Sequence, residues 1–287
     1  MAQILKGKEV VEALTETMKK DVEALKARGV TPALGIIRLG ERDDDISYEK
    51  GAKKRCESVG VDVKQYLLPA DASQERLLDV IREANADRGV HGVLLFRPLP
   101  RHIDDNAIRA ALLPEKDIDG ITDGSLAGVF ANTGLGFPPC TAEACMAILA
   151  HYGVDPAGRR VTVIGRSLVI GRPVAMMLMH KNATVTICHT KTRDLPSVAR
   201  EAEIVIVAAG KAEAVTGEYF REGQTVIDVG IHVKEGGGLC GDVKFAEAEP
   251  VVKAITPVPG GVGTVTTCVT IRHVIEAAQK ALESGQQ

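Results

Sequence analysis

The chain of 287 residues exceeds the usual size of one domain, so its length predicts two domains. Hydrophobic residues make up 45% of it and charged residues 25%, which is ordinary for a globular protein with sizeable cores. The formal charge of -3 argues against partners such as nucleic acid or an anionic membrane surface.

The N-terminal segment is charged throughout and lacks the apolar core of a signal peptide. No segment approaches the length of about 20 apolar residues that a membrane-spanning helix requires. The six cysteines form neither a CxxC pair nor a His–Cys pattern with metal-site spacing; they are Cys56, Cys140, Cys145, Cys188, Cys240 and Cys268. We therefore expect a cytoplasmic protein with reduced thiols and no metal site.

Short apolar runs alternate with helical patterns along the first 100 residues. Strands are expected at 32–40, 62–69 and 89–98, and helices at 5–28, 46–59 and 74–87. Such alternation predicts parallel βαβ units. Residues 101–139 are rich in Pro, Gly and Asp, so loops and one short helix are expected there. A further helix is predicted at 142–153, where Gly153 ends it.

A second series of strands follows, at 159–165, 183–189, 203–210 and 224–230, with a helical segment between the first two. This layout predicts a Rossmann-like dinucleotide-binding domain. Residues 264–284 have the length and periodicity of one final helix. The predicted fold class is therefore α/β, with two α/β domains of which the second is Rossmann-like.

The segment VTVIGRSLVIGRP, residues 161–173, is expected to form a buried strand, a turn with Gly165 and Gly171, and the start of a helix. Exposed backbone N–H groups at that helix start, with Ser167 and either Arg166 or Arg172 nearby, would suit a phosphate group. The match to the pattern GxGxxG is imperfect because Ser167 stands where the second glycine belongs. Such a strand–turn–helix is equally consistent with an ordinary α/β connection.

The end of the next strand, ICHTKTR, bears on the choice between NAD and NADP. An NAD site usually has an acid there, about 20 residues beyond the glycines, which binds the ribose hydroxyls. No acid occurs from Ala183 to Arg193, whereas Thr190 and Lys191 offer hydroxyl and basic groups. We therefore expect NADP rather than NAD, because NADP carries a 2′-phosphate. The alternative is a solvated strand end.

The segment SYEKGAKKRC places Tyr48 at the start of a predicted helix. The positions on its side of the helix hold Gly51, Ala52 and Arg55, none of which is a lysine. The three lysines of the segment are therefore expected to face solvent or to contact the anionic tail of a substrate.

Several segments are too particular for a generic α/β chain. They are RPLP (97–100), PEKDIDGIT (114–122), PPCTAEA (138–144), IGRSLVIGRP (164–173), CHTKT (188–192), VIDVGI (226–231), GDV (241–243) and ITPVPGGVGTVT (255–266). In this order and spacing they resemble the methylenetetrahydrofolate dehydrogenase/methenyltetrahydrofolate cyclohydrolase family. The resemblance covers nearly the whole chain, and PEKDIDG and TPVPGGVG are its most specific parts.

This resemblance implies oxidation of 5,10-methylenetetrahydrofolate to 5,10-methenyltetrahydrofolate with NADP or NAD, in one-carbon folate metabolism. Many members of the family also hydrolyse the methenyl product to 10-formyltetrahydrofolate. The resemblance further implies a homodimer, and two α/β domains with a folate cleft between them. Residues 1–138 plus 267–287 would form the folate-binding catalytic domain, and residues 139–266 the NAD(P)-binding domain.

The resemblance also assigns roles to single residues. Tyr48 matches the tyrosine that stacks on the pterin, and Asp119 matches the acid that accepts pterin N–H groups, so both are expected to be catalytic and substrate-binding. Pro259, Gly260 and Gly261 match the loop that closes over the substrate. The expected dinucleotide contacts are Gly165, Arg166, Ser167, Thr190 and Ile231, with Lys191 added from the basic strand end. The alternatives are a half-buried helix aromatic for Tyr48 and a loop acid for Asp119.

Two departures from the family pattern concern the hydrolysis. Ala52 stands where a lysine usually follows the tyrosine by four residues, and Phe96 stands where a glutamine usually precedes the proline-rich run. In the family, the glutamine influences the lysine that helps water attack the methenyl carbon. We therefore expect a dehydrogenase whose cyclohydrolase activity is strongly reduced.

Three alternatives stay open. A fully bifunctional enzyme could use another lysine, such as Lys53 or Lys54 on a shifted helix. The chain could also be a Rossmann dehydrogenase that acts on an unrelated acid. A rival of another class is a non-catalytic protein that binds folate or a nucleotide.

Overall fold

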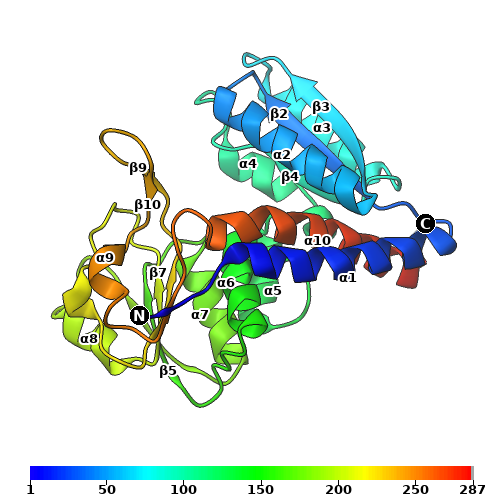
Figure 1. Cartoon of the computed structure of the whole chain (residues 1–287). Helices are drawn as coiled ribbons and strands as arrows, with labels where there is room; N and C mark the ends of the chain where they lie inside the picture. Colours follow the sequence, from blue (N-terminus) through cyan, green and yellow to red (C-terminus); the bar gives the residue numbers. More distant parts are fainter. Residues whose placement is uncertain (286–287) are drawn as a thin grey trace. The chain divides into compact units, whose positions relative to one another are not determined.

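The computed structural model describes residues 1–285, which form two compact units (Figure 1). Unit 1 consists of Met1–Glu12 and Thr141–Thr266, and unit 2 of Ala13–Cys140 and the chain from Thr267 onward. Each unit has its own parallel sheet and its own hydrophobic core, which confirms the predicted class of two α/β domains. In the part of the chain described, no helix is long and apolar enough to cross a membrane.

Unit 2 is built on a sheet of three parallel strands in the order β3–β2–β4. They are β2 (Ala33–Leu39), β3 (Asp62–Leu68) and β4 (Gly92–Leu95). Every position of the central β2 is buried, as expected for a strand of a parallel sheet covered on both faces. The strands expected at 32–40 and 62–69 are confirmed, and the one expected at 89–98 exists but is shorter.

Two helices cover opposite faces of this sheet. α3 (Gln74–Ala86) packs on one face, where it shares a core with Ile37. α2 (Asp43–Val59) lies against the other face, where Arg38 forms an ion pair with Glu49 at 2.8 Å. Neighbouring strand residues such as 37 and 38 point to opposite faces, so the two helices must lie on opposite sides. The ion pair also sets the rotation of α2 about its axis, because the side of the helix that carries Glu49 must face the sheet.

The remaining helices with residues in unit 2 are α1 (Gly7–Ala27), α4 (Asp105–Ala111), α5 (Asp123–Ala131), α10 (Val262–Glu283) and the 3-10 helix η1 (Pro114–Lys116). The segment 101–139 therefore holds two α-helices and a 3-10 turn, where one short helix was expected. Side-chain caps start both helices: Asp104 accepts the N–H of Asn106, and Thr122 accepts that of Ser125. Apolar periodicity in α5 is weak, so pattern analysis missed it.

Unit 1 is built on six parallel strands in the order β1–β11–β8–β7–β5–β6. They are β1 (Gln3–Ile4), β5 (Arg160–Ile164), β6 (Thr184–Cys188), β7 (Ile204–Val207), β8 (Thr225–Asp228) and β11 (Ala254–Ile255). The four strands expected in this region correspond to β5–β8 and are confirmed. The chain continues from β6, on one side of β5, to β7 on its other side. Ligands of open parallel sheets bind at the carboxyl ends of strands beside such a reversal.

Helices and one hairpin complete unit 1. The helices are α6 (Cys140–His151), α7 (Gly171–His180), α8 (Leu195–Glu201), α9 (Phe245–Ala248) and the 3-10 helix η2 (Gly217–Tyr219). β9 (His232–Val233) and β10 (Leu239–Cys240) pair in an antiparallel hairpin. The helices expected at 142–153 and after the glycine turn correspond to α6 and α7. No expectation covered the hairpin, because its strands are too short to show a period.

The start of the chain differs from the predicted domain division. The prediction placed residues 1–138 together, but Met1–Glu12 belongs to unit 1. There β1 pairs with β11 at the edge of the six-stranded sheet, and the N–H of Gln3 donates to the carbonyl of Lys253 at 2.9 Å. A strand of two residues has no readable periodicity, so only its pairing partner decides where it belongs.

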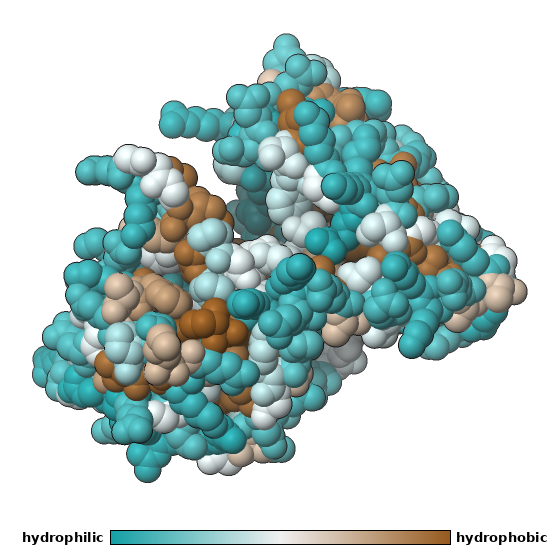
Figure 2. Space-filling model, viewed as in Figure 1, coloured by the Kyte–Doolittle hydropathy of each residue, from teal (hydrophilic) through white to brown (hydrophobic). Residues whose placement is uncertain are grey.

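Figure 2 shows hydrophilic surface over most of both units with several apolar patches between, and one of these patches lies at the β9–β10 hairpin of unit 1. There Ile231, Val233 and Leu239 are 62%, 78% and 38% exposed. The six cysteines, by contrast, are all buried free thiols, as the expectation of reduced cysteines requires.

Candidate active site

The glycine turn after β5 packs closely against neighbouring backbone. Gly165 has a φ of 132°, and a Cβ atom there would lie 2.3 Å from the carbonyl oxygen of Ala208. A Cβ atom at Gly171 would lie 2.2 Å from the carbonyl oxygen of Gly165. Both positions therefore require glycine, and the turn leads directly into the first residues of α7.

A pocket of about 860 Å³ lies at the carboxyl ends of β5, β6, β7 and β8 in unit 1. Five of the six expected dinucleotide contacts line it, namely Gly165, Arg166, Ser167, Thr190 and Ile231. The sixth, Lys191, is exposed on the loop after β6 and does not line the pocket. The hydroxyl of Ser167 and the guanidinium of Arg166, just before the start of α7, suit phosphate groups. The pocket thus has the size and the donor groups that a dinucleotide requires.

Hydrogen bonds within the loop after β6 hold it in place. The backbone N–H of Lys191 donates to Nδ1 of His189 at 3.1 Å, and the backbone N–H of His189 donates to Thr192 Oγ1 at 2.9 Å. Asp194 follows with a φ of 48° and lines the pocket. Asp194 directly follows the acid-free run from Ala183 to Arg193, and its carboxylate was not among the predicted contacts.

Two buried carboxylates shape the loops around the unit 1 pocket, and sequence reasoning assigned a role to neither. Asp228 ends β8 and accepts the backbone N–H groups of Gly230, Asp242 and Val243, each at 3.0 Å. Burial raises the pKa of Asp228 to about 6, although these hydrogen bonds oppose the rise. Asp242 lines the pocket and lies 2.8 Å from Nε2 of His232. The sequence feature that could have indicated Asp228 and Asp242 is their position in the segments VIDVGI and GDV.

The loop from Pro259 to Gly261 joins β11 to α10 and lies in unit 1. The carbonyl of Gly260 accepts the backbone N–H of Gly7 at 2.7 Å. A Cβ atom at Gly261 would lie 2.5 Å from the carbonyl oxygen of Pro257. Close packing of backbone against backbone is therefore a sufficient reason for glycine at 261, and the expected role of this loop over the substrate stays a prediction.

In unit 2, the ring of Tyr48 on α2 contacts the ring of Phe96, the residue that follows β4. Their ring centroids lie 5.8 Å apart at an interplanar angle of 82°, an edge-to-face contact. Tyr48 is 38% exposed, and its hydroxyl hydrogen-bonds to Thr267 and Thr270 of α10. Burial raises the pKa of Tyr48, so the phenol is neutral and can donate its proton. Tyr48 thus presents a fixed, partly open ring.

Ala52 lies one helical turn after Tyr48, on the same side of α2, and is fully buried. Tyr48 contacts Phe96, and Ala52 lies on the Tyr48 side of α2; that the three positions act on one substrate stays a prediction. The methyl group of Ala52 and the ring of Phe96 supply no polar atom. A proton-transferring group is consequently absent from both positions where the family pattern has one.

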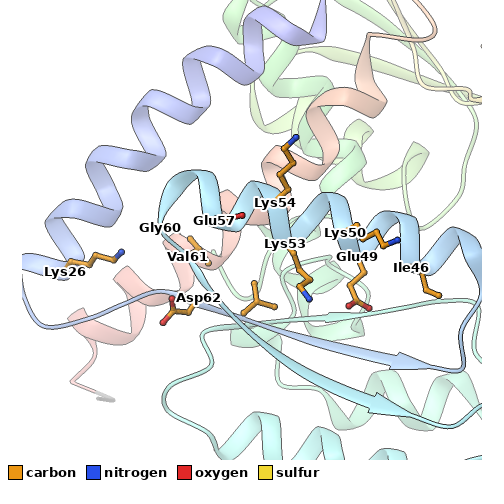
Figure 3. Close-up of a pocket in the computed structure, with 11 residues that line it drawn as sticks. Lys26, Ile46, Glu49, Lys50, Lys53, Lys54, Glu57, Gly60, Val61 and Asp62 are labelled. Carbon is orange, nitrogen blue, oxygen red and sulfur yellow. The ribbon is translucent and has the colours of Figure 1, made fainter.

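The lysines of α2 lie along another side of the helix. Figure 3 shows a pocket lined by Lys50, Lys53 and Lys54 together with Lys26 and acidic residues. The side chains of Glu49 and Lys53 point toward the sheet there, and Lys53 Nζ donates to Gln65 Oε1 on β3 at 3.1 Å. Five residues along a helix correspond to a rotation of about 140°, so Lys53 and Tyr48 project in different directions.

The two acids of KDID have different surroundings. Asp117 is fully buried and accepts the N–H groups of Ile121 and Thr122 at 3.0 and 2.7 Å and the hydroxyl of Ser125 at 2.6 Å. It therefore has the loop-acid role considered as the alternative for Asp119. Asp119 itself is only partly buried and is hydrogen-bonded by the thiol of Cys140.

The charge state of Asp119 depends on several neighbours in unit 2. Burial raises its pKa to about 6, and the Cys140 hydrogen bond opposes the rise. The carboxylate of Asp117 raises the pKa further, while His273 and Arg97 lower it. At neutral pH the carboxylate is ionised and can accept N–H donors from a ligand.

Comparison with protein families and known proteins identifies the family of this chain. A model described as the catalytic domain of tetrahydrofolate dehydrogenase/cyclohydrolase matches residues 5–119, and the model of its NAD(P)-binding domain matches residues 139–282. The bifunctional protein FolD of Carboxydothermus hydrogenoformans is 48% identical over 281 residues, which cover 97% of this chain and 98% of that protein.

Solved structures of two FolD proteins superpose on nearly the whole chain. The crystal structure of bifunctional FolD from Campylobacter jejuni superposes with a TM-score of 0.94 at 35% identity, covering 98% of this chain and 99% of that one. FolD from Trypanosoma brucei, solved with NADP and an inhibitor, superposes with a TM-score of 0.90 at 34% identity, covering 98% of each chain. The chain therefore belongs to the tetrahydrofolate dehydrogenase/cyclohydrolase family.

Proposed function

We propose that the protein oxidises 5,10-methylenetetrahydrofolate to 5,10-methenyltetrahydrofolate with NADP as the oxidant. The observation that carries the proposal is the pair of Tyr48 and Asp119 in unit 2. It combines a partly open aromatic ring with an acid whose acceptor capacity the fold leaves available. A flat pterin with an aminopyrimidinone edge needs both, a ring to stack on and a carboxylate that accepts adjacent N–H donors.

The residues of unit 1 supply the second half of the reaction. NADP, when bound, accepts a hydride at its nicotinamide ring. Arg166 and Ser167 would hold phosphate groups of the dinucleotide, and Thr190 and Asp194, which line the same pocket, would bind ribose hydroxyls. The chain's contribution to the chemistry is therefore binding and orientation, because hydride transfer needs no proton-transferring side chain.

The preference for NADP over NAD is supported by the charge of the loop after β6. Lys191 and Arg193 are exposed there, and Arg166 lines the same pocket. Only Arg166 lines the pocket, but Lys191 and Arg193 lie on the loop beside it, and cations there suit a 2′-phosphate. Asp194 favours the opposite choice, since a carboxylate in the pocket can bind the free ribose hydroxyls of NAD.

We propose that hydrolysis of the methenyl product is much slower than the oxidation. Ala52 is fully buried without a polar side-chain atom, and Phe96 packs edge-to-face on Tyr48. A second candidate is a fully bifunctional enzyme, which the names of the relatives from Carboxydothermus hydrogenoformans and Campylobacter jejuni favour. Lys53 and Lys54 are the lysines considered for that role, and the hydrogen bond of Lys53 to Gln65 argues against Lys53.

We also propose a homodimer. The exposed apolar side chains of Val233 and Leu239 on the β9–β10 hairpin support a contact between copies through this surface. Analytical ultracentrifugation tests the proposal: the wild type should sediment as a dimer, and Val233→Lys should weaken it. A monomeric wild type would contradict it.

One experiment tests the proposed activity and its limits together. Steady-state rates are measured for methylenetetrahydrofolate with NADP and with NAD, and for loss of supplied methenyltetrahydrofolate above its spontaneous rate. Formation of reduced dinucleotide only in the presence of methylenetetrahydrofolate supports the dehydrogenase. Tight binding of both ligands without turnover would instead identify a non-catalytic binding protein.

A further inference from the structure

His232 lines the dinucleotide pocket of unit 1, and a buried carboxylate holds its ring. Nε2 of His232 lies 2.8 Å from Oδ1 of Asp242. The same carboxylate accepts the backbone N–H groups of Gly210 and Lys211, at 3.0 and 2.8 Å. Asp242 is 1% exposed, so protein donors rather than solvent surround its oxygens. One ring nitrogen of His232 is therefore committed to the protein.

The contact with Asp242 decides which ring nitrogen of His232 carries the hydrogen. A carboxylate only accepts, so Nε2 must be the donor. In the neutral ring Nδ1 is then an acceptor, with its lone pair in the ring plane. Within residues 1–285 nothing donates a hydrogen bond to this Nδ1, and the ring is partly exposed at the pocket. His232 therefore offers a ligand one acceptor of defined position.

The backbone around this pair is held at two places. The carboxylate of Asp228 accepts the N–H groups of Gly230 and Asp242, each at 3.0 Å. It thereby ties the segment that precedes His232 to the residue that holds its ring. His232 is also the partner of Cys240 in the antiparallel pairing of β9 with β10. The ring is thus oriented before any ligand binds, which lowers the cost of binding.

The place of His232 in the pocket indicates which half of a dinucleotide it contacts. In a Rossmann-like domain the pyrophosphate lies at the glycine turn, and the ribose of the adenosine half lies at the end of the next strand. Here these places are the turn with Gly165 and the loop with Thr190 after β6. His232 follows β8, which β7 and β5 separate from β6 in the sheet. The nicotinamide half is therefore the part within reach of His232.

We propose that Nδ1 of His232 accepts an N–H of the nicotinamide carboxamide and thereby fixes the orientation of the nicotinamide ring. The proposal rests on the proposed function, because it takes NADP as the ligand of this pocket. A carboxamide has an NH2 group on one side and a carbonyl on the other, so an acceptor of defined position distinguishes the two. Asp242 is a positioning residue, since it acts through the ring of His232.

Two analogues of NADP test this contact by binding alone. In one, an acetyl group replaces the carboxamide, which removes the N–H donors and keeps the carbonyl. In the other, a thioamide replaces it, which keeps the NH2 group. Binding is measured by isothermal titration calorimetry at a mildly alkaline pH, which favours the neutral ring. The wild type should bind the acetyl analogue about fivefold more weakly than NADP, as for one lost neutral hydrogen bond, and the thioamide analogue as tightly as NADP.

Variants at position 232 show whether this discrimination belongs to His232. His232→Ala should remove it, so that NADP and the acetyl analogue bind equally well. His232→Lys keeps a donor beside Asp242 but has no acceptor, so it should remove the discrimination too, and its added charge affects both ligands alike. His232→Gln can donate to Asp242 through its amide NH2 group and present its carbonyl oxygen to the pocket. It should therefore keep most of the discrimination.

A second histidine of the pocket provides the matched control. Nδ1 of His189 already accepts the backbone N–H of Lys191 at 3.1 Å, and His189 lies at the adenosine end. His189→Ala should therefore leave the ratio of the two dissociation constants unchanged. A fragment of NADP without the nicotinamide, 2′-phospho-ADP-ribose, should bind the variants at position 232 as tightly as the wild type, which shows that their pocket is folded.

The outcomes separate this inference from the proposed function. Equal binding of NADP and the acetyl analogue by the wild type overturns the inference, as does discrimination that survives in His232→Ala and His232→Lys. Should His232→Ala fail to bind 2′-phospho-ADP-ribose, the comparison of His232→Lys with His232→Gln decides the question. A wild type that binds NADP and discriminates as expected, but does not oxidise methylenetetrahydrofolate, overturns the proposed function alone.

Discussion

Asp228 in unit 1 and Asp119 in unit 2 have the same raised pKa of about 6, and both owe it to burial. Their hydrogen bonds differ. Asp228 accepts three backbone N–H groups, so its oxygens are committed to the loops that follow β8. Asp119 is hydrogen-bonded by one weak donor, the thiol of Cys140. A shifted pKa alone therefore does not distinguish an acid that shapes the fold from one that is available to a ligand; the remaining acceptor capacity does.

In contrast to the two acids, Ala52 has no hydrogen-bond donor or acceptor in its side chain. The largest expected effect, on hydrolysis of the methenyl product, concerns this position. Methenyltetrahydrofolate hydrolysis by the wild type should be slower than in a family member with lysine and glutamine by about 10²- to 10⁴-fold, the usual worth of a positioned proton-transfer group. Ala52→Lys alone should recover little, because position 52 is fully buried and an ammonium there would lose its hydration.

The pair Ala52→Lys and Phe96→Gln should recover more hydrolysis than the two single changes together, as expected for residues that act as a unit. Loss of supplied methenyltetrahydrofolate above the spontaneous rate is the measurement. Robust wild-type hydrolysis would mean that another group acts, and Lys53→Ala and Lys54→Ala would then show which lysine it is.

Substitution of Asp228, the acid that holds the loops after β8, should destabilise the protein. Asp228→Ala leaves the N–H groups of Gly230, Asp242 and Val243 without their acceptor, and each buried unpaired group costs about 1 to 3 kcal/mol. We expect the free energy of unfolding to fall by about 3 kcal/mol or more, with weaker NADP binding. Urea denaturation measures it, and a loss below about 1 kcal/mol would contradict the assignment.

Removing Asp119 should have the complementary result. Asp119→Ala should lower kcat/KM for methylenetetrahydrofolate by about 100-fold, because two charge-assisted hydrogen bonds to the pterin are lost. Stability and NADP affinity should stay close to wild type. Asp117→Ala is the informative neighbour, since it should instead destabilise the loop that Ile121 and Thr122 belong to. Normal folate kinetics in Asp119→Ala would refute the role assigned from PEKDIDG.

The pH profile distinguishes the two acids without relying on large losses. Asp119 binds the pterin in its ionised form, so kcat/KM for the folate should fall about tenfold per pH unit below about pH 6. Asp119→Asn should abolish this acidic limb, whereas Asp228→Asn should keep it. An acidic limb that survives in Asp119→Asn would assign the titration to another group.

The smallest effect concerns the dinucleotide. We expect kcat/KM to favour NADP over NAD by about tenfold or more, since one charge-assisted contact to the 2′-phosphate has that worth. Lys191→Ala combined with Arg193→Ala should reduce the preference, and Asp194→Asn should weaken use of NAD more than of NADP. Initial rates with both dinucleotides decide it. Equal or better kcat/KM with NAD would show that Asp194 dominates over the cations.

Much of the architecture could be predicted from the sequence because it is local. Apolar runs of strand length alternate with helical periods, and this alternation indicated both parallel sheets. The turn with Gly165 and Gly171 was recognisable because close backbone approach leaves no other residue possible. The side of α2 that carries Tyr48 and Ala52 followed from helical spacing alone. The family segments then supplied the roles that local patterns cannot.

Only the tertiary structure decided what distant contacts determine. β1 has two residues, and its place in the sheet comes from Ala254 and Ile255. The different surroundings of Asp117 and Asp119, two residues apart, depend on Ser125 for one and on Cys140 and His273 for the other. Hydrogen-bonding capacity is used up by partners from far along the chain. The sequence by itself therefore determined which chemical groups are present, and the fold decided which of them remain available to a ligand.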